Sequence, residues 1–494
     1  MKFSLLSNVP DKSGECAVIY DLSLDRAVRN IIDNKRYADY FISVLEKPLT
    51  NIENIKYRQE IFQDLLKTEG LMQSLKTLFS RYDKIKSDWQ EMKLGAFKGS
   101  GSDINSEALL EHTFSSLKVT AVFPATIASF FTMIGKTLSE YQISSKGLCS
   151  IRDWCLEMAE NEALKELVEI SQKFRYKTPS DFDFTACFSM SKSLALDGCD
   201  LCGIQEKKQL STFGKLFSKG KDKSDYDSIK AELSGIGEDP LNDAQYILNE
   251  SLSRIDTALT KVTGDVYEAF FGLSTELMFY ECALEYAKKA KNSGVCTVMP
   301  TVYEKEKDFI CVKGLKELVL LSNGLGAKTV ENDLDLKNED HGLLVKGLTD
   351  SGKTVYLRAI GCAQLFAQAG LPVLAQEAEM SIREGFFSHF SSAEEEFLKG
   401  DSKGRFDQEA TEIAKILDKL KPYSLLLLNE TFQTTSYKEG TESIYNILRF
   451  MPKLKTKYVF VTHLTRLFDY MKNEKAILAH TSDSEESKYK IIVD

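Results

Sequence analysis

The sequence lacks the features that would mark an unusual class of protein. Nine prolines and two tryptophans in 494 residues exclude a proline-rich or collagen-like chain. The ten cysteines are scattered without pattern, which argues against a disulfide scaffold and favours a reducing cytoplasm. No apolar run approaches the length of a membrane span, and the first residues show no signal-peptide pattern. We therefore expect a cytoplasmic globular protein with no membrane partner.

Positive charge is also in deficit. The formal net charge of −10 argues against a protein coated with positive charge for wrapping nucleic acid. It leaves room for a local basic patch, because phosphate binding responds to the local potential. At 494 residues the chain is too long for one ordinary core, so two to four domains are expected.

The strongest pattern in the chain is a glycine-rich loop between two apolar segments, in residues 341–361. Leu343 to Val345 read as a buried strand, and residues 347–354 fit G-x-x-x-x-G-K-[ST] ahead of a helical pattern. A chance match in a surface loop is the alternative, and the flanking strand and helix argue against it. The sequence thus predicts a nucleotide triphosphate site. Its predicted nucleotide-binding residues are Gly347, Leu348, Thr349, Asp350, Ser351, Gly352, Lys353, Thr354 and Val355.

Each part of this loop has a chemical role. Gly347 and Gly352 let the backbone curl so that successive N–H groups form an anion nest, to which the following helix adds its positive dipole end. Lys353 can reach the outer phosphates, and the Thr354 hydroxyl can ligate Mg²⁺.

Two later strands end in polar residues that suit the same chemistry. The run Leu425 to Leu428 leads to Asn429 and Glu430, and a second apolar run, 458–462, leads to His463. Asn429 is a candidate Mg²⁺ ligand without negative charge, and Glu430 a candidate general base. His463 is either a sensor of the terminal phosphate or a structural histidine. His112, His389 and His480 carry no such pattern.

The first half of the chain is predicted to be mainly helical. Residues 24–92 show helical spacing interrupted at Pro48, and residues 106–172 continue it through a strongly apolar portion that we interpret as core. A long helical pattern follows over residues 241–292.

The segment 176–240 is the least regular part of the sequence. Its lysine-rich stretch 207–223 surrounds two phenylalanines and fits either a basic tip that touches phosphates or a solvated surface loop. Cys199 and Cys202 fit either zinc or redox chemistry or two half-buried thiols.

Several of these segments resemble the MutS family of DNA mismatch-repair ATPases. The similar segments are PLTNIENIKYRQEIFQDLL at 48–66, VEND at 330–333, VYLRAIGCAQLFAQAGLPVLAQEAEMSI at 355–382 and TFQTTSYKEG at 431–440. The resemblance implies an α/β P-loop ATPase domain of the ABC type over 306–494. It also implies a mainly α-helical core over 1–105 and a helical lever region over 106–305 with an irregular insertion near 176–240.

The resemblance also carries functional expectations. It implies ATP and Mg²⁺ as cofactors, Asn332 near the base, a homodimer, and DNA as a partner. It further implies that the mismatch-reading and connector domains and the C-terminal helix-turn-helix are absent. Gly404 and Arg405 stand where the family has serine and threonine in a loop that reaches the partner's ATP.

We expect a MutS-like ATPase that couples its nucleotide state to movement of helical arms on DNA, and Asn429 and Gly404 are compatible with slow hydrolysis. It would act in mismatch repair or recombination. The alternative is a regulatory switch or scaffold that acts on a protein partner, with weak or no hydrolysis and no mismatch recognition. An unrelated P-loop kinase is a third reading, but no phosphate-acceptor pocket is suggested.

Overall fold

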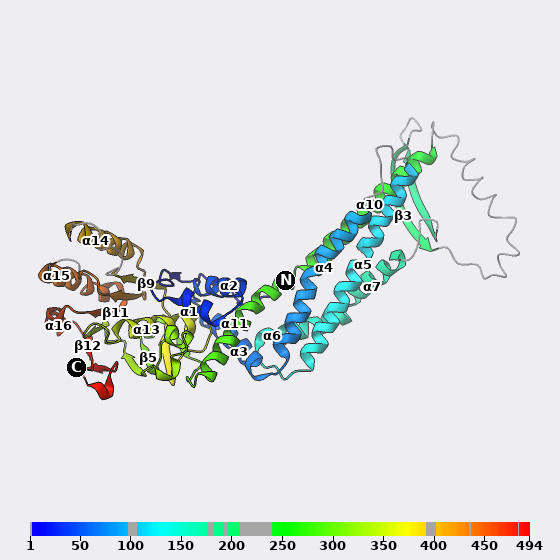
Figure 1. The fold of residues 1–494 in the computed structure, drawn as a ribbon. Helices are drawn as coiled ribbons and strands as arrows, with labels where there is room; N and C mark the ends of the chain where they lie inside the picture. Colours follow the sequence, from blue (N-terminus) through cyan, green and yellow to red (C-terminus); the bar gives the residue numbers. More distant parts are fainter. Residues whose placement is uncertain are drawn as a thin grey trace, which may run out of the picture. The chain divides into compact units, whose positions relative to one another are not determined.

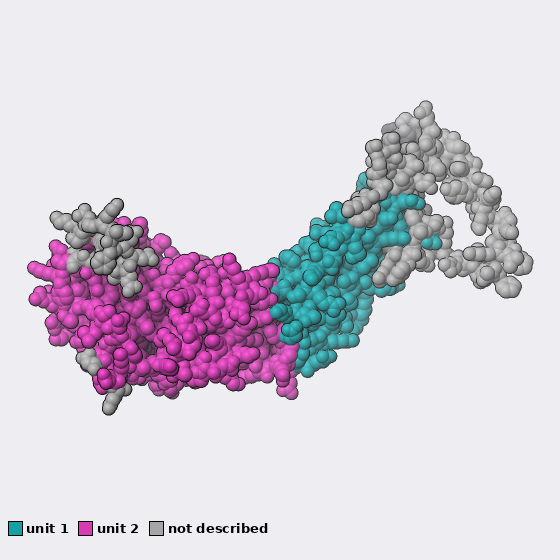
Figure 2. Space-filling model, in the orientation of Figure 1, with its two compact units in different colours: residues 1–3, 73–141, 149–274 teal, residues 4–72, 142–148, 275–494 magenta. Residues whose placement is uncertain are grey.

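The chain folds into two compact units, which are described separately below (Figures 1 and 2). The computed structural model describes residues 2–96, 106–175, 181–190, 196–206, 240–391, 402–433, 436–482 and 484–494. Unit 1 comprises residues 1–3, 73–141 and 149–274, and unit 2 comprises residues 4–72, 142–148 and 275–494. The chain therefore passes between the units several times. The three-segment division drawn from the sequence stays a prediction.

Unit 1 is built from long helices and one antiparallel hairpin. Its elements, some of which begin in unit 2, are α4 (Leu71–Ala96), α5 (Ser106–Ser139), α6 (Lys146–Glu160), α7 (Glu162–Arg175), β2 (Phe182–Met190), β3 (Leu196–Glu206) and α10 (Pro240–Tyr267). Helix α5 packs against α7 and α10. The lysine-rich stretch 207–223 and the side chains of Cys199 and Cys202 lie outside the described residues.

Helix α5 bears on the interpretation of residues 106–172 as core. Over Glu111–Ser139 it is long and apolar enough to cross a bilayer by length and composition alone, a test that the core helix of a globular unit also passes. Half of its most apolar window is buried inside the protein. Phe114 and Leu117 pack with Leu252 and Leu259 of α10, which makes α5 the core helix of unit 1.

The long helix predicted over 241–292 is interrupted, so that part of the prediction is wrong. Helix α10 ends at Tyr267 and α11 (Leu273–Asn292) begins after a turn. Gly272 adopts a φ of 92°, a left-handed conformation that no helix interior accommodates. Its N–H donates to the Asp83 carboxylate at 3.0 Å, which fixes the break.

Unit 2 contains a seven-stranded sheet in the order β1-β9-β10-β11-β7-β12-β13, parallel except for β13. The strands are β1 (Glu15–Cys16), β7 (Gly342–Lys346), β9 (Gly385–Phe390), β10 (Leu425–Asn429), β11 (Lys457–Thr462), β12 (Ala476–Thr481) and β13 (Ile491–Val493). The leucine run becomes a central strand because both faces of the sheet are covered. As a result the carboxyl ends of β7, β10 and β11 lie side by side.

A smaller four-stranded sheet in the order β4-β8-β5-β6 accompanies the large one. Its strands are β4 (Thr301–Tyr303), β5 (Ile310–Leu315), β6 (Asn332–Leu336) and β8 (Glu377–Ser381). The helices of unit 2 are α1 (Leu24–Ile31), α2 (Lys35–Leu45), α3 (Ile52–Lys67), α11, α12 (Leu318–Ser322), α13 (Lys353–Gln368), α14 (Ser402–Lys419), α15 (Tyr437–Leu448) and α16 (Thr465–Met471). Short 3₁₀ helices occupy Lys305–Lys307, Gly326–Lys328, Met451–Leu454 and Glu485–Ser487.

Helix α13 lies against the large sheet because its middle consists of small residues. A Cβ atom on Gly361 would approach Leu427 of β10 to 2.7 Å, so only glycine permits this separation. Close packing of α13 on β10 and β11 fixes the start of the helix at the carboxyl ends of the strands.

Candidate nucleotide site

The loop between β7 and α13 has the conformation that a phosphate cradle needs. Asp350 and Gly352 adopt φ angles of 59° and 90°, which curl the backbone between strand and helix. A Cβ atom on Gly347 would collide with the hydroxyls of Thr481 and Ser351. Leu348, Thr349 and Asp350 form the exposed rim of the loop, and Ser351, Thr354 and Val355 are half-buried.

Lys353 is held inside this loop. Its side chain is 5% exposed, and Nζ donates to the carbonyl oxygens of Gly347 at 3.0 Å and Leu348 at 2.8 Å. The same Nζ lies 3.6 Å from Oε1 of Glu430. Burial lowers the pKa of Lys353, and the Glu430 charge opposes that shift. Lys353 thus places a cation beside the carboxyl ends of β7 and β10.

Asn429 and Thr354 face each other beside this lysine. The Thr354 hydroxyl donates to Oδ1 of Asn429 at 2.9 Å. Both side chains offer neutral oxygen atoms, and no cluster of three or more His, Cys, Asp or Glu side chains that could hold a metal exists among the described residues. This donor set suits Mg²⁺, which is usually held by one or two protein ligands together with substrate phosphates and waters.

Glu430 follows β10 in a left-handed conformation, with φ at 54°. A non-glycine residue in this conformation costs about 1–2 kcal/mol. Its carboxylate accepts from the His463 N–H at 3.2 Å, and His463 Nε2 lies 3.2 Å from Oε1. Burial raises the pKa of Glu430, whereas burial and the nearby Lys353 lower the pKa of His463. The lowered pKa favours a neutral imidazole at His463 near pH 7, beside the Glu430 carboxyl.

The three predicted groups Lys353, Glu430 and His463 thus converge from the ends of three neighbouring parallel strands. Nζ of Lys353 lies 3.4 Å from Nε2 of His463 as well as near Glu430. Asn332, expected near the base, forms hydrogen bonds through its side-chain amide to the C-terminal segment, and its role stays a prediction. Its Nδ2 donates to the Tyr489 carbonyl at 3.1 Å, and its Oδ1 accepts from the Ile491 N–H at 2.7 Å.

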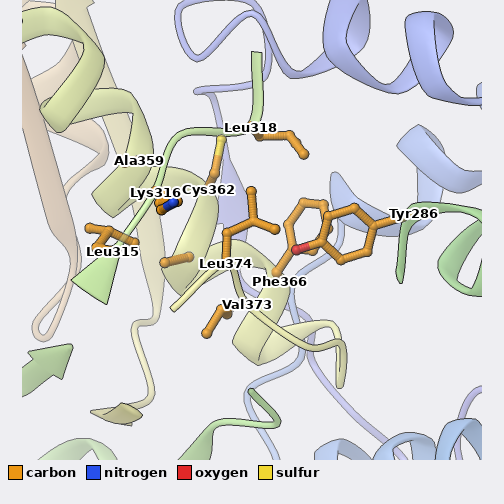
Figure 3. A pocket seen from close by; sticks show the side chains of 10 residues that line it. Tyr286, Leu315, Lys316, Leu318, Ala359, Cys362, Phe366, Val373 and Leu374 are labelled. Atoms are coloured by element: carbon orange, nitrogen blue, oxygen red, sulfur yellow. The ribbon is translucent and has the colours of Figure 1, made fainter. Parts of the chain in front are cut away.

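A cavity further along α13 is not part of this site. It is about 10 Å³ in volume and is lined mainly by apolar side chains, including Tyr286, Cys362, Phe366 and Leu374 (Figure 3). This space holds at most one water molecule. The cavity is a small packing gap beneath the helix, too small for any nucleotide.

Comparison with known proteins agrees with this geometry. Residues 343–494 match the family model for MutS domain V. Over these residues the chain carries a MutS domain V. It is 24% identical over 462 residues to MutS protein homolog 4 from Mus musculus, covering 86% of this chain and 46% of that protein. It is 29% identical over 201 residues to DNA mismatch repair protein Msh3 from Mus musculus, covering 40% and 18%.

A bacterial protein is also among the relatives. DNA mismatch repair protein MutS from Clostridium novyi (strain NT) is 35% identical over 142 residues, covering 28% of this chain and 15% of that protein. The alignments to all three relatives cover less than half of the relative's own length.

Two residues of this MutS-family site were missed in the sequence. The Tyr489 ring lies against Gly352, where an added Cβ would approach it to 3.2 Å, and the residue is 41% exposed. Its only sequence signal is a single aromatic residue near the end of the sequence. His389, to which the sequence assigned no role, is buried with Nδ1 2.9 Å from the hydroxyl of Thr431, the residue after Glu430.

The expected departure at Gly404 and Arg405 falls at the start of α14. Their backbone is helical, and their side chains lie outside the described residues. The effect of Gly404 and Arg405 on contact with a partner's ATP stays a prediction.

Proposed function

We propose that this MutS-family protein binds ATP with Mg²⁺ at the β7–α13 loop and hydrolyses it with Glu430. The observation that supports this most strongly is the convergence of Lys353, Glu430 and His463 at the ends of three adjacent parallel strands. Ligands of open α/β sheets bind outside the carboxyl ends of the strands. A buried lysine, a carboxylate and a neutral imidazole at that place suit a terminal phosphate and an attacking water.

Each residue would contribute a defined step. The loop N–H groups and the start of α13 hold the phosphates. Lys353 releases its hydrogen bonds to the two loop carbonyls and contacts the outer phosphates. Glu430 accepts a hydrogen bond from the attacking water and orients it. His463, neutral near pH 7, donates or accepts a hydrogen bond at the terminal phosphate. The exposed ring of Tyr489 offers a flat surface on which the base can stack.

Thr354 and Asn429 would hold the metal. Their hydroxyl and amide oxygens already lie 2.9 Å apart. Bound Mg²⁺ would neutralise charge on the phosphates, while Asn429 adds none of its own. Because the Asn429 amide brings no negative charge to the metal, we expect weak metal binding and hence slow turnover.

We further propose that nucleotide state moves the helical arms of unit 1 on DNA, in a homodimer. The names of Msh3 and MutS describe them as DNA mismatch repair proteins, and a mismatch repair or recombination role follows by relationship. Cys16, Cys155, Cys282 and Cys362 carry free thiols, which fits the proposed cytoplasmic location.

A regulatory switch acting on a protein partner is the second candidate, and Asn429 favours it. Without a charged metal ligand, ATP would set a conformation and be hydrolysed weakly or not at all.

The Lys353→Ala variant tests the site. We expect at least a hundredfold loss of affinity for a fluorescent ATP analogue, because the phosphates lose their buried cation. Lys337→Ala is the matched control, since Lys337 is an exposed lysine 3.8 Å from Asp335. Wild-type affinity in Lys353→Ala would sink the proposal.

A further inference from the structure

The turn that carries Glu430 bends through the left-handed region twice. Glu430 has a φ of 54° and Phe432 a φ of 62°, and neither is glycine. Such conformations persist only where surrounding contacts hold them. The contacts that hold this turn therefore determine where the Glu430 carboxylate points.

The neighbouring strands provide part of that support. The Glu430 N–H donates to the Val461 carbonyl of β11 at 3.0 Å. On the other side, Thr431 is fully buried and its hydroxyl contacts Nδ1 of His389 on β9. These contacts hold the beginning of the turn. The second left-handed residue, Phe432, is held by a different element.

That element is α14, through Glu409. The Glu409 residue is 8% exposed, and its two carboxylate oxygens have different donors. Oε2 accepts from the Phe432 N–H at 3.0 Å, and Oε1 accepts from the Ser391 hydroxyl at 2.7 Å. The ring of Phe406, also on α14, lies 5.4 Å from the Phe432 ring. Helix α14 thus contacts both the backbone N–H and the ring of Phe432.

We infer that Glu409 is a positioning residue for hydrolysis, holding the turn from α14 so that the Glu430 carboxylate faces the attacking water. The inference rests on the proposed function. A charged acceptor makes the stronger hydrogen bond to a backbone N–H, and displacement of a catalytic group by about 1 Å can cost roughly 100-fold in rate. A shift of α14 would reach Glu430 by the same route, so the position of this helix sets the hydrolysis rate.

The test compares Glu409→Ala, Glu409→Gln and the wild-type chain in ATP turnover and in binding of a fluorescent ATP analogue. Glu409→Ala loses both contacts, so we expect kcat to fall at least tenfold while nucleotide affinity stays within about twofold. Glu409→Gln should recover most of kcat, because its amide oxygen accepts from Phe432 and its NH₂ donates to Ser391. Asp418→Ala is the control, an exposed acid on the same helix.

Hydrogen–deuterium exchange of the segment 425–433 separates this inference from the proposed function. Faster exchange at Phe432 in Glu409→Ala, with the kcat loss above, supports the positioning role. Unchanged exchange, unchanged kcat, or parallel losses of kcat and affinity overturn it. A wild-type chain that binds ATP without turnover contradicts the proposed hydrolysis, and exchange at Phe432 then decides whether Glu409 is the anchor.

Discussion

The hydroxyl of Thr354 donates a 2.9 Å hydrogen bond to the side-chain oxygen of Asn429. This contact joins the first turn of α13 to the end of β10, where the metal of the proposed site would be held. Both side chains are neutral, so the phosphates would supply the negative charge that Mg²⁺ needs there. The next residue after Asn429, Glu430, carries the carboxylate closest to it in the sequence. Metal dependence is consequently the property in which this protein should be most sensitive to a single change.

Asn429→Asp should strengthen metal binding. The added carboxylate attracts Mg²⁺ directly, and we expect the half-saturating Mg²⁺ concentration for ATP turnover to fall roughly tenfold, equivalent to about 1.4 kcal/mol. Asn338→Asp adds the same charge at an exposed loop position and serves as the control. A wild-type rate near zero that the aspartate restores favours the switch, whereas an unchanged Mg²⁺ dependence contradicts the assignment of Asn429.

Glu430→Gln should separate binding from hydrolysis. The amide cannot take a proton from water, so turnover should fall about 10²–10⁴-fold while ATP stays bound. Retention of radiolabelled ATP on a filter, followed by product analysis, measures both effects. Glu442→Gln is a suitable comparison because Glu442 is exposed on α15. Near-normal turnover in Glu430→Gln would show that another group activates the water.

The pH profile of kcat/KM should be bell-shaped. Glu430 acts only when ionised, and burial raises its pKa above the ordinary 4.5, so activity is lost as the pH falls through that raised value. Lys353 binds phosphate only when protonated, and burial lowers its pKa below 10.5, so activity is also lost as the pH rises through that value. Lys353→Arg should move the alkaline limb upward. An acid limb at or below pH 4.5 is incompatible with Glu430 as the base.

Arg383→Met should destabilise unit 2. Arg383 is fully buried and pairs with Asp308 at 2.5 Å, and the other Asp308 oxygen lies 3.7 Å from the buried Lys457. Methionine leaves Asp308 with the longer contact alone, which should cost about 3 kcal/mol of unfolding free energy in urea. Combining it with Asp308→Asn should recover part of that loss, and equal stability of single variant and wild type would refute this account.

The local part of the site could be predicted from the sequence, and the long-range part could not. A strand, a glycine loop and a helix depend on neighbouring residues, so the positions of Gly347 and Lys353 followed from the pattern alone. Strand β10 followed for the same reason, since four consecutive leucines fit a strand covered on both faces.

Tyr489, by contrast, reaches the loop because Asn332, 157 residues away, holds its carbonyl. His389 and Thr431 meet across 42 residues through strand pairing. Contacts of this kind depend on the order of strands in the sheet, about which periodicity carries no information. The break before α11 was missed because a hydrophobic repeat continues across Gly272 while the backbone does not.

The short strand β1 has a consequence for biosynthesis. Asp21, just after it, accepts a hydrogen bond from Ser388 of β9, 367 residues later. At a translation speed of about 5–20 residues per second, the opening segment waits roughly 20 to 70 s before its partner leaves the ribosome. During that interval α1 can already pack on α2, but Leu22 lacks α13, which it meets at Gly361 in the finished fold. The nascent chain therefore leaves the apolar side chain of Leu22 without this cover until α13 emerges.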